Sequence, residues 1–301
     1  MSGVHNLISK SLASNNLASK ISKMNRLLNI ELLKIWKNKS SRVLTVAYFV
    51  LLTFIALIAS IKFDIGPIHV DPAENGIFNF PYIYHFNTYV ADYISFFLAI
   101  VIVSMMANEY SYGTLKQNLI DGLSKKEFVL SKFYTVILFA FVATAFIFIM
   151  SLILGFCYSS YTEIGIVFSG LIYLLAFFVK LLGFFSMCLF LGILVKRSAF
   201  ALGFLFVWFL FEKILYGILK YELFDRSENV DTFFQFMPLE SMGNLLIEPI
   251  SRLSVVKNVT TQIGVDGIKD YDVHFSSILI VLVWTAIFVF LSYKLLKKRD
   301  L

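Results

Sequence analysis

Two charged side chains, Lys180 and Glu212, lie inside long apolar stretches of this 301-residue sequence and are its first candidates for chemistry. An ionised group in apolar surroundings is costly, so it usually has a partner or a function. Lys180 lies 15 residues before Val195, and Glu212 lies 13 residues after Ala199. At ~1.5 Å per helical residue, both lie roughly 20 Å from the same edge of the apolar layer. We therefore predict an ion pair that fixes helix packing or lines a path through the apolar layer, with separate solvation of the two charges as the alternative and Lys213 facing water or headgroups.

Residue patterns of the common enzyme classes are absent from the sequence. It has no G-x-x-x-x-G-K-[ST] phosphate loop, no H-E-x-x-H, no G-x-S-x-G and no Cys/His cluster. Cys157 and Cys188 have neither metal nor disulfide spacing, so we expect both to pack within helices. Scattered polar residues of one loop rarely bind a metal, and this applies to His69, Asp71, Glu74 and His85. The sequence predicts no catalytic site, no metal site and no cofactor on this chain.

The composition indicates an integral membrane protein. Hydrophobic residues make up 58% of the chain, whereas soluble domains are nearer about 45–50% apolar. A membrane helix needs roughly 20 apolar residues, and no alternating pattern of a membrane barrel is present. We therefore expect an all-α fold with six transmembrane helices, the fourth of which is long enough to tilt or break: Val43–Ile61, Thr88–Ala107, Phe133–Cys157, Ile164–Val195, Ala199–Leu219 and Phe275–Tyr293.

The distribution of Lys and Arg predicts the orientation of these helices. Segments 1–42, 108–132, 192–198 and 294–301 together carry 18 Lys and Arg against 5 Asp and Glu, whereas the other connecting segments carry 6 against 14. Both termini should therefore be cytoplasmic, and the net charge of +6 reflects attraction to a membrane surface rather than nucleic-acid binding.

The expected domains follow from this topology. Residues 1–23 are Ser- and Asn-rich without a signal-peptide core, so we expect a poorly ordered extension, with an alternative start at Met24. Residues 24–42 should form an interfacial amphipathic helix. Residues 43–301 should form the six-helix domain, with residues 220–274 as an extracellular segment.

The polar stretch NEYSYGTLKQNLIDGLSKKEF (Asn108 to Phe128) lies between the second and third apolar runs. Thr114 and Gln117 match a T-x-x-Q capping box, and Ser124 and Glu127 match a second one, S-x-x-E. Gly122 suits the left-handed residue that ends a helix. The pattern predicts a short helix between two turns, with leucines on one side at 115, 119 and 123. It is either an interfacial connector or a lever whose displacement tilts both flanking helices.

Two further stretches are apolar but are not predicted to be transmembrane helices. LLNIELLKIWKNKSSR (Leu27 to Arg42) has one apolar stripe that includes Trp36, so we expect a helix lying flat on the inner leaflet, or a basic flank of the first span. FFQFMPLESMGNLLI (Phe233 to Ile247) is too short to cross, and Pro238 can start a helix. It predicts short re-entrant helices, or a packed outer loop, around Phe236, Pro238 and Leu239.

These segments resemble the permeases of the ABC-2 type. The resemblance rests on Glu109, Gly113-Thr114, Leu119, Ser124-Lys125-Lys126 and Lys132, on Glu31 and Lys34 before the first span, and on the short helices after the fifth. Where the family often has Pro-x-Ser-Arg, this sequence has Gly122-Leu123-Ser124-Lys125, and Lys lacks the planar fork of Arg. The resemblance implies a coupling helix that docks on an ATP-binding subunit, with these residues: Glu109, Gly113, Thr114, Leu115, Lys116, Leu119, Gly122, Ser124, Lys125 and Lys132.

The function implied by the resemblance is the membrane subunit of an ATP-driven exporter in the bacterial cytoplasmic (inner) membrane. Its partners would be an ABC ATP-binding subunit that binds ATP and Mg²⁺, a second permease copy or related chain, and membrane lipids. An ion-coupled secondary carrier that uses Lys180 and Glu212 is the alternative, although no inverted repeat is evident. An intramembrane enzyme would need a nucleophile or metal ligands at depth.

Overall fold

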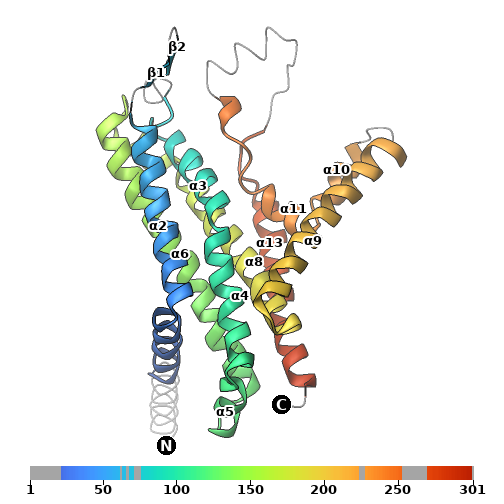
Figure 1. Ribbon diagram of the computed structural model, residues 1–301. Coiled ribbons are helices and arrows are strands. Elements are labelled where there is room, and N and C mark those ends of the chain that lie inside the picture. The colour runs from blue at the N-terminus through green and yellow to red at the C-terminus, as the bar shows by residue number, and fades with distance from the viewer. Residues whose placement is uncertain are drawn as a thin grey trace, which may run out of the picture.

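The computed structural model is a bundle of helices (Figure 1). It describes residues 22–61, 63–65, 68–70, 76–223, 228–252 and 270–299, and only the backbone of residues 63–65 and 68–70. The predicted all-α membrane class is confirmed, apart from a two-stranded hairpin of β1 (Phe63–Ile65) and β2 (Ile68–Val70) at one end. The N-terminal helix (residues 22–37), α5 and the C-terminus lie at the opposite end, here called the α5 end (Figure 1).

Five helical stretches of the described chain are long and apolar enough to cross a membrane, and a bent pair supplies a sixth if it is one span. Each overlaps one of the predicted runs. The five stretches are α2 (Lys39–Ala59), α6 (Lys125–Tyr158), α7 with α8 (Ile164–Ser169 and Leu171–Val195), α9 with the π-helix η1 (Ser198–Gly217 and Ile218–Leu223), and α13 (Phe275–Lys298).

The bent pair corresponds to the predicted second span. It consists of α3 (Tyr82–Ile94) and α4 (Phe96–Ser111), which meet at an angle of 44°. Ser95, between them, donates its hydroxyl to the backbone oxygen of Asp92 at 2.6 Å, a local bond that competes with the regular helical pattern. The helical stretch that corresponds to the predicted run Thr88–Ala107 therefore begins earlier, at Tyr82, and bends in the middle.

The predicted fourth span breaks at Gly170, where atoms of Pro81 and Tyr84 lie too close for any side chain. A Cβ on Gly170 would lie 2.8 Å from the oxygen of Pro81 and 2.9 Å from the ring of Tyr84. The longer part, α8, lies at the centre and packs against α3, α4, α6, α9 and α13. In this span 72% of the apolar window is buried inside the chain, against 11% for α2 and for α9, so α2 and α9 leave most of their apolar surface uncovered.

Among the described residues between η1 and α13, the chain forms three short helical segments. These are α10 (Glu228–Phe234), α11 (Pro238–Gly243) and the 3₁₀ turn η2 (Ile250–Arg252). Pro238 is the first residue of α11, as expected, and Leu239 packs against the core. The ring of Phe236 is exposed, while its backbone oxygen accepts a hydrogen bond from the Trp284 indole at 2.8 Å. The helices exist, and their re-entrant position in a membrane stays a prediction.

Several expectations concern residues outside the described chain. They are the disorder expected for residues 1–21 and the side chains of the loop residues His69, Asp71 and Glu74. Residues 22 and 23 of the expected extension, and Met24, belong to the N-terminal helix, and the alternative start at Met24 stays a prediction. The described residues hold no group of three or more His, Cys, Asp or Glu suited to a metal ion.

Candidate functional site

The segment between α4 and α6 bends through two glycine turns. Gly113 has a φ of 68° and Gly122 a φ of 91°, the left-handed region that glycine enters without strain. Between them lies α5 (Thr114–Ile120). Ser124 caps α6 through its hydroxyl, and Glu127 reaches back to the Ser124 amide at 3.1 Å. The predicted short helix, both turns and the second capping box are confirmed.

The first predicted capping box is wrong. The Thr114 hydroxyl donates to Oε2 of Glu109 at 2.6 Å instead of capping α5, whose N-cap is Gly113. Gln117 donates to Oδ1 of Asp121 at 2.9 Å rather than reaching back. Thr114 is the first residue of α5 rather than its N-cap, and its hydroxyl donates to the buried carboxylate of Glu109 in a charge-assisted hydrogen bond. This bond joins the start of α5 to the end of α4.

A glycine-to-alanine substitution tests the backbone at the second turn. In Gly122→Ala the new Cβ meets no atom within 4 Å, so the cost is conformational and should lower the free energy of unfolding by about 1–2 kcal/mol. Gly203→Ala, inside α9 with equally open surroundings, should instead raise it by about 1 kcal/mol. Unfolding of both purified variants in one detergent measures the difference. Equal effects of the two substitutions would rule out the left-handed turn.

Four charged side chains meet beside this bend in what we call the ion cluster: Glu31, Lys34, Glu109 and Lys132. Lys132, on α6, binds the carboxylates of Glu31 and Glu109, with 2.6 Å between its Nζ and Oε1 of Glu109. Lys34 lies 2.8 Å from the same oxygen and 3.5 Å from Glu31. The Lys132 side chain is 0% exposed and the two glutamate side chains 6% and 3%. Two carboxylates and two ammonium groups therefore balance in a site almost closed to water.

The ion cluster joins three helices that are distant in sequence. Glu31 and Lys34 come from the N-terminal helix, Glu109 from α4 and Lys132 from α6. Burial alone would lower the pKa of Lys34, but the carboxylates of Glu31 and Glu109 outweigh it and raise that pKa above its ordinary value. Lys34 therefore stays charged at neutral pH. Loss of any one charge would leave the others buried without full compensation.

Apolar side chains of α5 and α6 pack near the ion cluster. Leu115 of α5 is buried, and Leu119 and Leu123 pack against the core, so the predicted leucine stripe faces inward. The Lys132 ammonium lies 5.1 Å from the centre of the buried Phe128 ring. Lys116 points away from the core and is exposed, as the predicted docking face requires.

A second set of contacts joins the start of α6 to the C-terminus. Lys125 donates to the backbone oxygen of Arg299 at 2.8 Å. The Arg299 guanidinium in turn binds the last carbonyls of α8, those of Ile193 and Leu194, and the hydroxyl of Tyr110 at 3.2 Å. Sequence reasoning missed Arg299. Its position just after the last apolar run was the available signal, because cations favour helix C-termini.

Sequence reasoning singled out every member of the ion cluster but not their meeting. Glu31 and Lys34 were assigned to an interfacial helix, and Glu109 and Lys132 to a docking segment. The structure brings all four together at the point where the helices around α5 converge.

Residues 25–301 match the family described as ABC-2 family transporter protein. The chain belongs to the ABC-2 transporter family. Membership implies a membrane transport subunit rather than a catalytic one, and a partnership with an ABC ATP-binding subunit. Comparison with curated proteins finds no match.

Within the helices of this ABC-2 protein, the predicted Lys180–Glu212 ion pair is wrong. Lys180 pairs with Asp92 at 2.8 Å, at the bend between α3 and α4. Glu212 accepts hydrogen bonds from the Trp208 indole at 2.6 Å and from the first backbone amides of α11 at 3.2 and 3.0 Å. The prediction considered α8 and α9 alone, but α8 also faces the bend, where Asp92 pairs with Lys180. Lys213, expected in water or among headgroups, is about half exposed and pairs with Glu240 at 2.7 Å.

These charged groups line a cavity of about 600 Å³ between α3, α4, α8, α9 and α11. Its walls combine the Asp92–Lys180 pair with aromatic rings such as those of Tyr89, Phe184 and Phe209. Both a packing role and a path-lining role stay open for Lys180. The geometry assigns its partner, and a double-mutant cycle tests that partner.

The cycle of Lys180→Met with Asp92→Asn should give a coupling free energy of about 0.5–3 kcal/mol, because the two groups share one ion pair. The matched cycle of Lys180→Met with Glu212→Gln should give a value near zero. Thermal unfolding of the purified variants measures both. Coupling to Glu212 without coupling to Asp92 would restore the original pairing and overturn this one.

His85, at the hairpin end of α3, has a structural role in place of the metal-binding one considered for it. Its ring stacks on Tyr173 with centroids 4.4 Å apart, and Nε2 lies 2.7 Å from the oxygen of Ile247. Arg252 lies 3.2 Å from Nδ1 and donates to the Tyr173 hydroxyl at 2.9 Å. The arrangement fits a neutral imidazole that donates through Nε2, and it fastens η2 to α3 and α8.

Proposed function

We propose that this protein is the permease subunit of an ATP-driven exporter, and that α5 receives the motion of a separate ATP-binding subunit. ATP and Mg²⁺ bind that partner, and this chain binds no nucleic acid. The orientation that places α5 and both termini in the cytoplasm, in a bacterial inner membrane, rests on the excess of Lys and Arg in the segments at the α5 end.

The attachment of α5 carries this proposal. α5 is joined to α4 and α6 by tight glycine turns, and Thr114 at its start is hydrogen-bonded to Glu109 of α4. The ion cluster holds α4 and α6 to the N-terminal helix. A force on α5 therefore displaces helices together instead of bending a loop. ATP binding shifts the equilibrium between two permease states only if the partner contacts α5 differently in each.

A second copy of the chain, or a related chain, completes the transport path in this proposal. The uncovered apolar surfaces of α2 and α9 are the candidates for that interface, since only 11% of each apolar window is buried within one chain. Membrane lipids cover what the second chain does not.

Copurification from native membranes tests the proposal. An affinity-tagged full-length chain should bring down an ATPase subunit, and the purified complex should hydrolyse ATP. Exposed Lys116 should form a crosslink to that subunit through an amine-reactive reagent. A lone chain that is stable and transports down an ion gradient would support the secondary carrier and contradict the exporter.

A further inference from the structure

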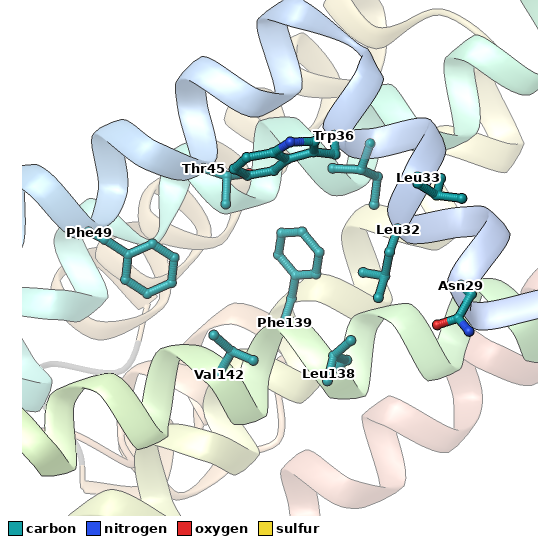
Figure 2. A pocket seen from close by; sticks show the side chains of 10 residues that line it. Asn29, Leu32, Leu33, Trp36, Thr45, Phe49, Leu138, Phe139 and Val142 are labelled. Carbon is teal, nitrogen blue, oxygen red and sulfur yellow. The ribbon is translucent and has the colours of Figure 1, made fainter. Parts of the chain in front are cut away.

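An open groove of about 700 Å³ lies between the N-terminal helix, the start of α2 and α6 (Figure 2). Figure 2 shows Leu32 and Trp36 on one side of the space and Phe139 and Val142 on the other. Its volume falls within the range of roughly 300–1,000 Å³ that is usual for ligand sites. The groove is therefore large enough for a ligand and is built from three separate segments.

The lining of the groove selects for a hydrocarbon chain. Eight of its ten residues are apolar, and the two polar ones are Asn29 and Thr45. The Thr45 hydroxyl already donates to the oxygen of Ser41 at 2.8 Å, so it is not available to a ligand as a donor. Polar ligands would find few partners here, whereas an acyl chain loses no hydrogen bond on entry.

Two arginines give the groove a charged rim. Arg42 precedes Thr45 by three residues and Phe49 by seven, and Arg26 stands in the same relation to Asn29 and Leu33, so each lies at the edge of the lining face of its helix. Both arginines are exposed, and neither guanidinium has a hydrogen-bond or ion-pair partner among the residues that the structure describes. Guanidinium groups bind phosphate through paired hydrogen bonds.

We propose that the groove binds one anionic glycerophospholipid, with an acyl chain between the N-terminal helix and α6 and the phosphate on Arg42. The lipid fills the space beside Glu31 and Lys34 and holds their helix against α6. This goes beyond general attraction to a charged leaflet, because one groove and one named arginine make the site. It does not depend on ATP or on the exporter function.

Trp36 supplies the measurement because it lines the groove, and bromine on an acyl chain quenches the fluorescence of a tryptophan that it touches. The full chain is placed in bilayers of phosphatidylcholine and phosphatidylglycerol, with one of the two brominated on its chains. The Trp36→Phe variant, measured in parallel, contains only Trp208 and Trp284. Subtracting its fluorescence from that of the wild-type chain leaves the fluorescence of Trp36. The readout is the preference of the Trp36 contact for phosphatidylglycerol over phosphatidylcholine.

The wild-type chain should prefer phosphatidylglycerol. Arg42→Gln should reduce the preference by about fivefold, because that is the usual contribution of one cation to the binding of an anionic membrane surface. Arg197→Gln, which removes an exposed arginine at the start of α9, should leave it unchanged. Val142→Phe fills the groove and should abolish the preference, whereas Val207→Phe, on the exposed face of α9, should not.

Three results would overturn the proposal. Equal quenching by the two brominated lipids would show that the groove does not select an anionic headgroup. If Arg42→Gln and Arg197→Gln lower the preference for phosphatidylglycerol equally, the preference depends on the overall charge of the chain and not on Arg42. Absence of quenching by either lipid means that protein, such as a second copy of the chain, covers the groove. Unfolding midpoints of all variants establish that each chain is folded.

Discussion

Replacement of Lys132 by methionine will lower the free energy of unfolding by about 3–5 kcal/mol, the usual cost of removing one partner of a buried ion pair. Lys132 is fully buried and is the shared partner of Glu31 and Glu109, so Lys132→Met leaves two carboxylates facing each other with only half-exposed Lys34 to balance them. Thermal and denaturant unfolding of the purified chain in one detergent measures the loss.

Two controls separate the ion cluster from charge in general. Lys116→Met removes an exposed lysine of α5 and should change stability by less than about 0.5 kcal/mol. Adding Glu31→Gln and Glu109→Gln to Lys132→Met removes the unpaired carboxylates and should recover part of the loss, because amides cost less to bury than charges. A Lys132→Met chain as stable as the wild type would show that the cluster does not hold these helices together.

Replacement of residues 114–123 by a Gly/Ser linker of equal length will uncouple ATP hydrolysis from transport. A flexible linker transmits no displacement to α4 and α6, so the stimulation of ATPase activity by the permease should fall by at least roughly tenfold, within the 1–3 kcal/mol usual for coupling between sites. The measurement is ATP hydrolysis by the copurified partner with wild-type or linker permease in the same bilayers.

A stiff replacement is the matched control for the linker. The same segment can be rebuilt from Ala, Gln, Lys and Glu while keeping Thr114, Leu115, Leu119 and Gly122, which preserves the bond to Glu109, the inward apolar face and the left-handed turn. Coupling should survive in this variant better than in the linker variant. Full coupling through the Gly/Ser linker in a chain that folds normally would end the proposal that α5 acts as a lever.

Much of the architecture followed from the amino-acid sequence because its signals are local. Apolar runs long enough to cross a membrane give the membrane-helix class directly, since backbone groups in lipid must be satisfied within each helix. The Ser124–Glu127 capping box and the glycine turn at 122 involve residues within a few positions of each other, and both were predicted correctly. Glu31, Lys34, Glu109 and Lys132 were recognised individually through the resemblance to ABC-2 permeases.

The tertiary structure alone decided which of these groups meet. Thr114 bonds to Glu109 instead of capping its own helix, and Lys180 pairs with Asp92 instead of Glu212. The close approach at Gly170 likewise depends on another part of the chain, because the atoms that leave no room for a side chain belong to Pro81 and Tyr84. A charged side chain in an apolar layer is stable only with a partner, so its position within an apolar run of the sequence already predicts that it is paired. Which partner it finds depends on the helix packed beside it, and the energy of that packing comes from residues far away along the chain.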